Sequence, residues 1–211
     1  MIKWLLVVFC LSVGAAEPAP LDYWEKSPEL WKKLTEERQI LVSAKNEDGR
    51  TISRGAGLVR ASVAEIWAFT TNTEKIKTSS RFIKEFKWDQ TSGDVDMLIE
   101  MIGISYRLRG KALPKPDPEN PKVELAVHEG SLVPFTALLE IRSPKAQAAI
   151  EGAPGFAEGS LVRLYGVSSR DRALSWPLRV ALEAVLQRSA GHLRTAVESE
   201  KVPAGVAPTT F

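Results

Sequence analysis

Histidines are the first side chains to consider for chemistry, because they serve as metal ligands and as general acids or bases near neutral pH. The chain has two, His128 and His192. They lie far apart, and neither is part of an HxxxH or HExxH motif, so no metal site is predicted. His128 shares its strand parity with Glu124, which predicts a solvent-facing ring. His192 lies at the edge of an apolar helical stripe and could reach an interior space; a hydrogen-bonded edge histidine is the alternative.

Carboxylates and nucleotide-binding loops give no stronger sign of catalysis. Asp94, Asp96 and Glu100 share one parity along a predicted strand, which is typical of a solvated row of charges and not of an acid–base pair. The sequence contains no G-x-S-x-G elbow, no P-loop and no G-x-G-x-x-G motif after a strand. We therefore predict no catalytic residue and no cofactor.

Ser189 is a polar residue in an unusual place, near the middle of the apolar stripe of the longest helical pattern, residues 175–200. One interpretation is that its hydroxyl donates to the carbonyl of Val185 or Leu186 and has no functional role. The other is that the helix faces a cavity there, and that Ser189 holds the polar end of a ligand.

This helix must be covered by a sheet, because its apolar stripe needs a partner. Pro177 suits its first turn. The apolar residues recur at three- and four-residue steps; they are Leu178, Leu182, Val185, Leu186, Leu193, Ala196 and Val197. Polar residues on the other side are expected to lie away from the core; these are Glu183, Gln187, Arg194 and Glu198.

The chain before this helix mostly alternates apolar and polar residues, which predicts strands. They are expected over residues 39–45, 50–60, 81–88, 95–101, 104–109, 123–128, 135–141 and 161–167, with short helices after Ser27 and Ser62 and at most one more within residues 70–80. Gly55 and Gly57 mark a bulge or a close approach. The proline-rich residues 114–121 are expected to form a loop, and residues 143–160 a long connection.

The N-terminus has the three parts of a secretory signal peptide. Lys3 is followed by a short apolar run, and Gly14 and Ala16 precede the expected cleavage site before Glu17. An uncleaved membrane anchor is the alternative. Cys10, the only cysteine, lies inside the apolar run and does not fit a lipobox, so the mature chain would have no disulfide.

We expect export to the periplasm or the extracellular space. The predicted organisation is a signal peptide over residues 1–16, a linker and N-terminal helix over residues 17–38, a domain over residues 39–200 and a flexible tail over residues 201–211. The formal net charge of +2 among 211 residues lacks the basic excess of a nucleic-acid binder. The basic cluster at residues 81–87 is interrupted by Glu85, as on a solvated strand face.

One stretch resembles a known superfamily. Residues 55–76, GAGLVRASVAEIWAFTTNTEKI, join a glycine-bearing strand to a small helix with a V-x-x-I-W pattern. Together with the order of the predicted elements and the approach LWKKLTEERQILVS at residues 30–43, this stretch is similar to the START-like superfamily, also called Bet v 1-like or polyketide cyclase/dehydrase. The resemblance covers residues 30–200. It implies an α+β helix-grip fold, in which a curved antiparallel sheet wraps a long C-terminal helix and two short helices follow the first strand.

The resemblance also implies a cavity between sheet and helix that binds a lipid or another hydrophobic small molecule. The expected lining residues are the inward-facing side chains, for each of which core filling is the alternative: Met97, Ile99, Met101, Tyr106, Leu108, Leu125, Val127, Leu182, Val185, Ser189, His192 and Leu193. The leading hypothesis is an exported, monomeric, non-catalytic binding or carrier protein, with transient membrane contact left open. A cyclase- or dehydratase-type enzyme using Tyr106, Ser189 and His192 is the second hypothesis, and an interaction module with a filled core is the third.

Overall fold

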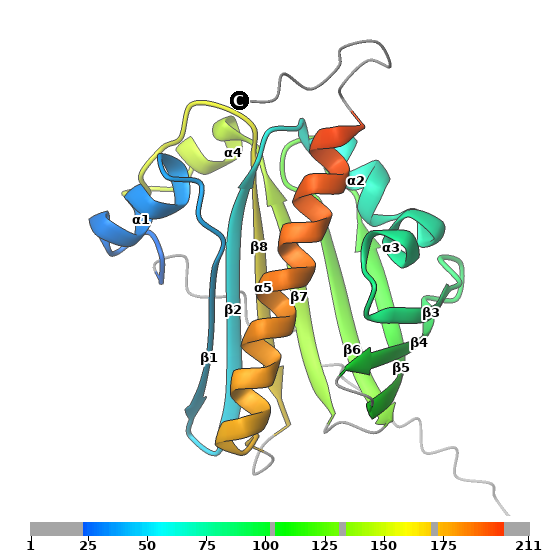
Figure 1. Ribbon diagram of the computed structural model, residues 1–211. Coiled ribbons are helices and arrows are strands. Elements are labelled where there is room, and N and C mark those ends of the chain that lie inside the picture. The colour runs from blue at the N-terminus through cyan, green and yellow to red at the C-terminus, as the bar shows by residue number, and fades with distance from the viewer. Residues whose placement is uncertain (1–22, 102–103, 131–133, 170–172, 201–211) are drawn as a thin grey trace, which may run out of the picture.

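The protein is a single antiparallel sheet with helices packed against it (Figure 1). The computed structural model describes residues 23–101, 104–130, 134–169 and 173–200. The predicted signal peptide and the predicted C-terminal tail lie outside these residues. The helices are α1 (Pro28–Thr35), α2 (Val63–Thr70), α3 (Thr73–Ser79), α4 (Pro144–Ala148) and α5 (Trp176–Ser199).

The strands of the described residues pair in the order β1-β2-β8-β7-β6-β5-β4-β3. Their bounds are β1 (Leu41–Glu47), β2 (Arg50–Val59), β3 (Ile83–Trp88), β4 (Asp94–Met101), β5 (Ile104–Lys115), β6 (Lys122–Gly130), β7 (Phe135–Arg142) and β8 (Ser160–Ser168). Two short helices, α2 and α3, follow β2, and the long helix α5 ends the described chain. This is the predicted α+β helix-grip architecture, except that the two short helices follow the second strand and not the first. Among the described residues, no helix has the length and apolar character needed to cross a bilayer.

Local signals in the sequence set where the first helices begin. The Ser27 hydroxyl accepts a hydrogen bond from Leu30 N at 3.3 Å, directly before Pro28 at the first helical position of α1. At α2 the Ser62 and Glu65 side chains each bond to the other's backbone N–H, which forms a capping box. These caps satisfy N–H groups that a helix start otherwise leaves unpaired, and they confirm the predicted starts.

Strand β5 is longer than predicted. Pro114, expected to open a loop, belongs to the strand and pairs with Val123 of β6. The neighbouring strand β4 begins at Asp94, which pairs with Lys111, so Pro114 lies beyond the end of β4. Its missing N–H therefore removes no ladder hydrogen bond on that side, which is why a proline is tolerated in a strand that is central elsewhere.

Both faces of the sheet are covered at β2 and β8. Neighbouring residues on a strand point to opposite faces, so each strand contributes to two apolar layers. On the α5 face, Val59 and Val162 pack with α2 and with Val197 of α5. On the opposite face, Ala56 and Leu161 pack against α1 and Trp24. The segment before β1 thus forms a second apolar layer on the sheet face that α5 does not occupy.

Helix α5 lies along β1 and β2 (Figure 1), and the side predicted to face away from the core contacts the edge strand. Glu183 Oε1 accepts a hydrogen bond from Ala44 N at 2.6 Å, and Gln187 Nε2 donates to Ile40 O at 2.9 Å. The prediction for this polar side was wrong for Glu183, which is half-buried, whereas Gln187 is exposed as predicted. An edge strand offers unpaired backbone groups, and these side chains satisfy them.

The same contact line continues toward the end of α5. Arg194 Nη1 donates to Arg38 O at 2.6 Å. Glu198 accepts from Arg38 Nη2 at 2.5 Å and from Arg60 N at 2.8 Å. The helix is therefore rotated relative to the predicted stripe, and the residue of α5 that is fully buried is Val197, 3% exposed.

Candidate functional site

A partly open cavity of about 190 Å³ lies between α5 and the sheet. Its walls come from α5, from β1 and the residue before it, and from β2, β7 and β8. Among these lining residues only Ser189 and Arg194 have polar side chains; the full set is Ile40, Val42, Gly55, Ala56, Gly57, Val59, Leu139, Val162, Leu164, Leu186, Ser189, Ala190, Leu193 and Arg194. Such a lining favours an apolar molecule.

Small residues on both walls make this space. The pairing of β2 with β1 and β8 is continuous at Gly55 and Gly57, so neither glycine forms a bulge. A Cβ at Gly57 would lie 3.5 Å from Ile40 Cγ1, and one at Gly55 would lie 3.5 Å from Leu164 Cβ. These are ordinary contacts, so crowding does not require glycine at either position. The consequence of the glycines is the absence of side chains where α5 crosses β2.

Ser189 lines this cavity, and its hydroxyl has no hydrogen-bond partner among the residues that the structure describes. The bond back to Val185 or Leu186, one of the two interpretations of its position, is therefore not formed. The helix does face a cavity at Ser189. A ligand-binding role for this hydroxyl remains a prediction.

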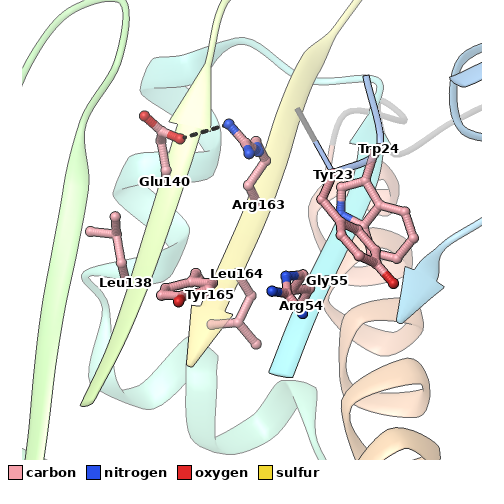
Figure 2. A pocket seen from close by; sticks show the side chains of 9 residues that line it. All are labelled: Tyr23, Trp24, Arg54, Gly55, Leu138, Glu140, Arg163, Leu164 and Tyr165. Carbon is pink, nitrogen blue, oxygen red and sulfur yellow. Dashed lines mark hydrogen bonds and ion pairs between the residues drawn. The ribbon is translucent and has the colours of Figure 1, made fainter. Parts of the chain in front are cut away.

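A second hollow, on the sheet face opposite α5, is lined by Tyr23, Trp24 and charged strand residues (Figure 2). Figure 2 shows Glu140 of β7 and Arg163 of β8 pointing toward one another; their atoms Oε2 and Nη1 are 3.4 Å apart. Arg142 Nη2 donates to the same Glu140 oxygen at 2.6 Å. The hollow measures about 10 Å³, room for a single water molecule and not for a substrate.

The charges around this hollow are deeply buried. The side chains of Glu140 and Arg163 are 8% and 6% exposed, and Glu25, 5% exposed, lies 3.7 Å from Arg163. Burial by itself raises the pKa of Glu140, but Arg142, Arg163 and Lys122 outweigh it, so that the pKa lies below its ordinary value. Burial and the neighbouring Arg142 lower the pKa of Arg163. We assign this network to structure, because no space for a ligand adjoins it.

Comparisons with known proteins give matches at the level of fold. No protein-family model matches this chain, and no curated protein matches its sequence. The crystal structure of Ara h 8.0201 superimposes with a TM-score of 0.52 at 10% identity, over 71% of this chain and 99% of that one. The two chains thus share the helix-grip fold.

Two bacterial structures share this fold. The solution structure of a protein from Arthrobacter aurescens gives a TM-score of 0.54 at 9% identity, over 76% of this chain and 92% of that one. A protein of unknown function from Staphylococcus aureus gives 0.51 at 13% identity, over 72% and 95%. At such identities the comparisons establish the helix-grip fold and do not identify a ligand.

The helix-grip sheet places the strand residues predicted to line a cavity on the face that α5 packs against. Leu125 pairs with Ala137, two residues from the cavity-lining Leu139, and the register continues this face through β5 and β4. None of the predicted strand residues whose side chains are described lines the 190 Å³ cavity; these are Met97, Ile99, Tyr106, Leu108, Leu125 and Val127. The Met101 side chain lies outside the description.

The predicted residues of α5 divide into three groups. Ser189 and Leu193 line the cavity, Leu182 and Val185 are half-buried without lining it, and His192 is exposed. Arg194, Ala190 and the β2 glycines also line the cavity and were not predicted to do so. The glycine pair was the available signal, since two glycines on one face of a strand leave room for whatever lies above them.

Proposed function

We propose that this protein binds a hydrophobic small molecule in the cavity between α5 and β2. The observation that supports this most directly is the cavity itself, whose lining is apolar except for Ser189 and Arg194. The helix-grip fold agrees with it, since proteins of this fold family bind hydrophobic small molecules. The driving force is removal of the ligand's apolar surface from water.

The size of the space sets the class of ligand. An engineered cavity of about 150 Å³ in another protein binds benzene, so one of about 190 Å³ accommodates a ring or a short acyl segment. Burying ~150 Å² of apolar surface is worth ~4 kcal/mol, which corresponds to binding in the millimolar range. Tighter binding requires polar contacts at one end of the ligand, or a longer ligand that buries further apolar surface outside the cavity mouth.

The second part of the proposal is that the protein is exported and acts as a carrier in the periplasm or outside the cell. Lys3, the apolar run after it and the Gly14-x-Ala16 ending motivate this. N-terminal sequencing of protein purified from its own host should find Glu17 as the first residue. An intact Met1, or an acyl group on Cys10, would contradict export with cleavage.

An enzyme using the same cavity is the alternative function, and the described residues offer it no specific support. Tyr106 and His192, its two further polar candidates, do not line the cavity with Ser189. Among the lining residues there is no carboxylate or imidazole to act as a general base.

Native mass spectrometry of the protein from its own host tests binding directly. We expect a co-purifying mass that is lost on denaturation and that has a ring or an alkyl chain. Recombinant protein stripped of this molecule should take it up again. Bare protein from the host, together with no uptake of any short-chain alkanol in calorimetry, would contradict the proposal.

A further inference from the structure

The start of α5 is apolar and exposed to solvent. Trp176, Leu178 and Val180 are 68%, 43% and 45% exposed, and they lie within five residues of one another. The other exposed large apolar side chain of the described residues, Leu113, is 46% exposed and belongs to β5. Single apolar residues are common on protein surfaces, whereas a cluster of this kind indicates contact with another apolar body.

These side chains surround the helix and do not form a single flank. At about 100° per residue, Leu178 lies about 160° around the helix axis from both Trp176 and Val180. Pro177, which is also exposed, lies between Trp176 and Leu178. A protein partner would cover one flank and leave the other in water, whereas a bilayer surrounds an inserted helix end. A stable protein interface also buries about 1,200–2,000 Å², far more than one helix end offers.

The start of α5 lies at the lower end of the molecule in Figure 1, beside the turn between β1 and β2. Leu174 N donates to Thr51 Oγ1 at 2.7 Å, and Asn46 Nδ2 donates to Leu174 O at 3.0 Å, so the turn is bonded to the segment before the helix. The cavity lining of α5 begins at Leu186, about 12 Å along the helix axis from Leu178. A body that contacts the helix start therefore leaves the cavity residues of α5 uncovered.

The charges at this end suit an anionic surface. Arg50 of the turn and Arg179 of α5 have no carboxylate partner among the residues that the structure describes. Asp48 of the same turn is exposed, and Glu47 is already paired with Arg54 at 3.0 Å. Two free guanidiniums and one free carboxylate leave a positive excess, to which the N-terminal end of the helix dipole adds.

We propose that the start of α5 docks on a bilayer that contains anionic lipids, with Trp176, Leu178 and Val180 inserted at the boundary of the acyl chains and Arg50 and Arg179 at lipid phosphates. Tryptophan concentrates at this boundary because it combines an apolar ring with a polar N–H. An arginine beside it can keep its stem in the apolar layer and its guanidinium at the headgroups. The inference goes beyond the proposed function, because it concerns a surface outside the cavity.

The experiment measures co-sedimentation of the purified full-length protein with lipid vesicles. Vesicles of phosphatidylcholine mixed with phosphatidylglycerol are compared with vesicles of phosphatidylcholine alone. We expect tighter binding to the mixed vesicles, and a loss of that preference as salt is added, since salt screens the attraction between exposed charges.

Two variants assign the binding to the helix end. Trp176→Ser should lower the partition coefficient about tenfold or more, because the apolar area of the indole no longer leaves water on docking. The matched control is Leu113→Ser, which removes the exposed apolar side chain of β5 and should bind like the parent. Parent and variants share residues 1–16, so any contribution of that apolar segment is the same in all of them.

Hydrogen exchange localises the contact. In the parent, mixed vesicles should protect the amides of residues 178–182 and leave those of residues 109–113 unchanged. Should Trp176→Ser and the parent sediment equally, this measurement decides: protection at residues 178–182 supports docking there, and its absence assigns the binding to another segment and overturns the proposal.

The remaining outcomes are equally definite. A parent protein that does not sediment with mixed vesicles overturns the docking. Equal binding to both kinds of vesicle overturns the role of the arginines. A concentration-dependent dimer in sedimentation velocity, abolished by Trp176→Ser, assigns the surface to a second copy of the chain and overturns the bilayer. Octanol binding in calorimetry tests the cavity separately, and Trp176→Ser should leave it unchanged, because Trp176 lies outside the cavity lining.

Discussion

The Glu183 carboxylate of α5 accepts a hydrogen bond from the backbone N–H of Ala44 in β1, at 2.6 Å. Gln187 and Arg194 extend this line of contacts to the carbonyls of Ile40 and Arg38. The long helix is thus held along the edge strand by polar side chains on one flank. These contacts add to the apolar packing of Val197, Leu193 and Ala196 against the core, and a cavity remains between the helix and β2.

The first prediction is that Glu183→Ala destabilises the protein by about 1–3 kcal/mol. Ala44 is buried, and its N–H would lose its partner. The matched control is Arg188→Ala, an exposed residue of the same helix, which should change the unfolding free energy by less than about 0.5 kcal/mol. Urea unfolding of both variants measures the difference. Equal effects would show that the edge contact does not hold α5.

The second prediction concerns the β2 glycines. In Gly57→Val the new side chain enters the cavity beyond a Cβ that meets Ile40 at ordinary contact distance. We expect a melting temperature within a few degrees of the parent and a clear loss of octanol binding. Gly155→Val, with nothing within 4 Å of its Cβ, adds the same volume away from the cavity and should bind normally. Retained binding in Gly57→Val would place the ligand elsewhere.

A contrasting glycine tests the strand register. A Cβ at Gly110 would lie 2.1 Å from the carbonyl oxygen of Ala126, a backbone atom that cannot move aside. Gly110→Ala should therefore lower the unfolding free energy more than Gly57→Ala does. We expect a difference of about 1–3 kcal/mol or more, the range typical of overpacking. Chemical denaturation of the two single-methyl variants makes the comparison. A harmless Gly110→Ala would contradict the β5–β6 pairing.

Much of the fold could be predicted because its signals are local. The capping pair Ser62 and Glu65 marks a helix start, and the two-residue period marks the strands, whatever the rest of the chain does. The rotation of α5 could not be predicted, because helical periodicity assigns Glu183 and Gln187 to solvent. It contains no information on the unpaired backbone of a strand more than a hundred residues away.

The buried charges on the other face escaped prediction for a similar reason. Alternating charges such as Glu140 and Arg163 are typical of a solvated strand face. Here Tyr23 and Trp24, from a segment assigned to linker and helix, lie over that face and exclude water from it. Only the tertiary arrangement shows that these strand charges are buried and therefore need partners of opposite charge.

The fourth prediction addresses this network. Glu140→Gln removes the carboxylate between Arg142 and Arg163 and leaves buried guanidiniums with less compensation, so it should cost about 3–5 kcal/mol. Glu129→Gln, whose exposed carboxylate lies 3.9 Å from Arg109, should cost less than about 0.5 kcal/mol. A small effect of Glu140→Gln in urea unfolding would mean that water reaches the network.

The network also predicts a pH dependence. The pKa of Glu140 is lowered from its ordinary value of 4.5, so its ionised form stabilises the fold fully above that pH. The contribution declines as the pH falls below 4.5 and is lost once the pH has passed through the lowered pKa. The stability gap between the parent and Glu140→Gln should therefore narrow in acid. A gap that stays constant down to the acid unfolding of both proteins would contradict the lowered pKa.

The last prediction returns to Ser189, which lines the cavity and whose hydroxyl has no hydrogen-bond partner among the described residues. In Ser189→Leu the larger side chain enters open space, so the thermal melt should hardly change while octanol uptake falls. His192→Leu makes a similar change at an exposed position of the same helix and should leave uptake intact. If the helix instead met a packed core at Ser189, the added volume would cost about 1–3 kcal/mol. A destabilised Ser189→Leu with unchanged uptake would remove this position from the binding site.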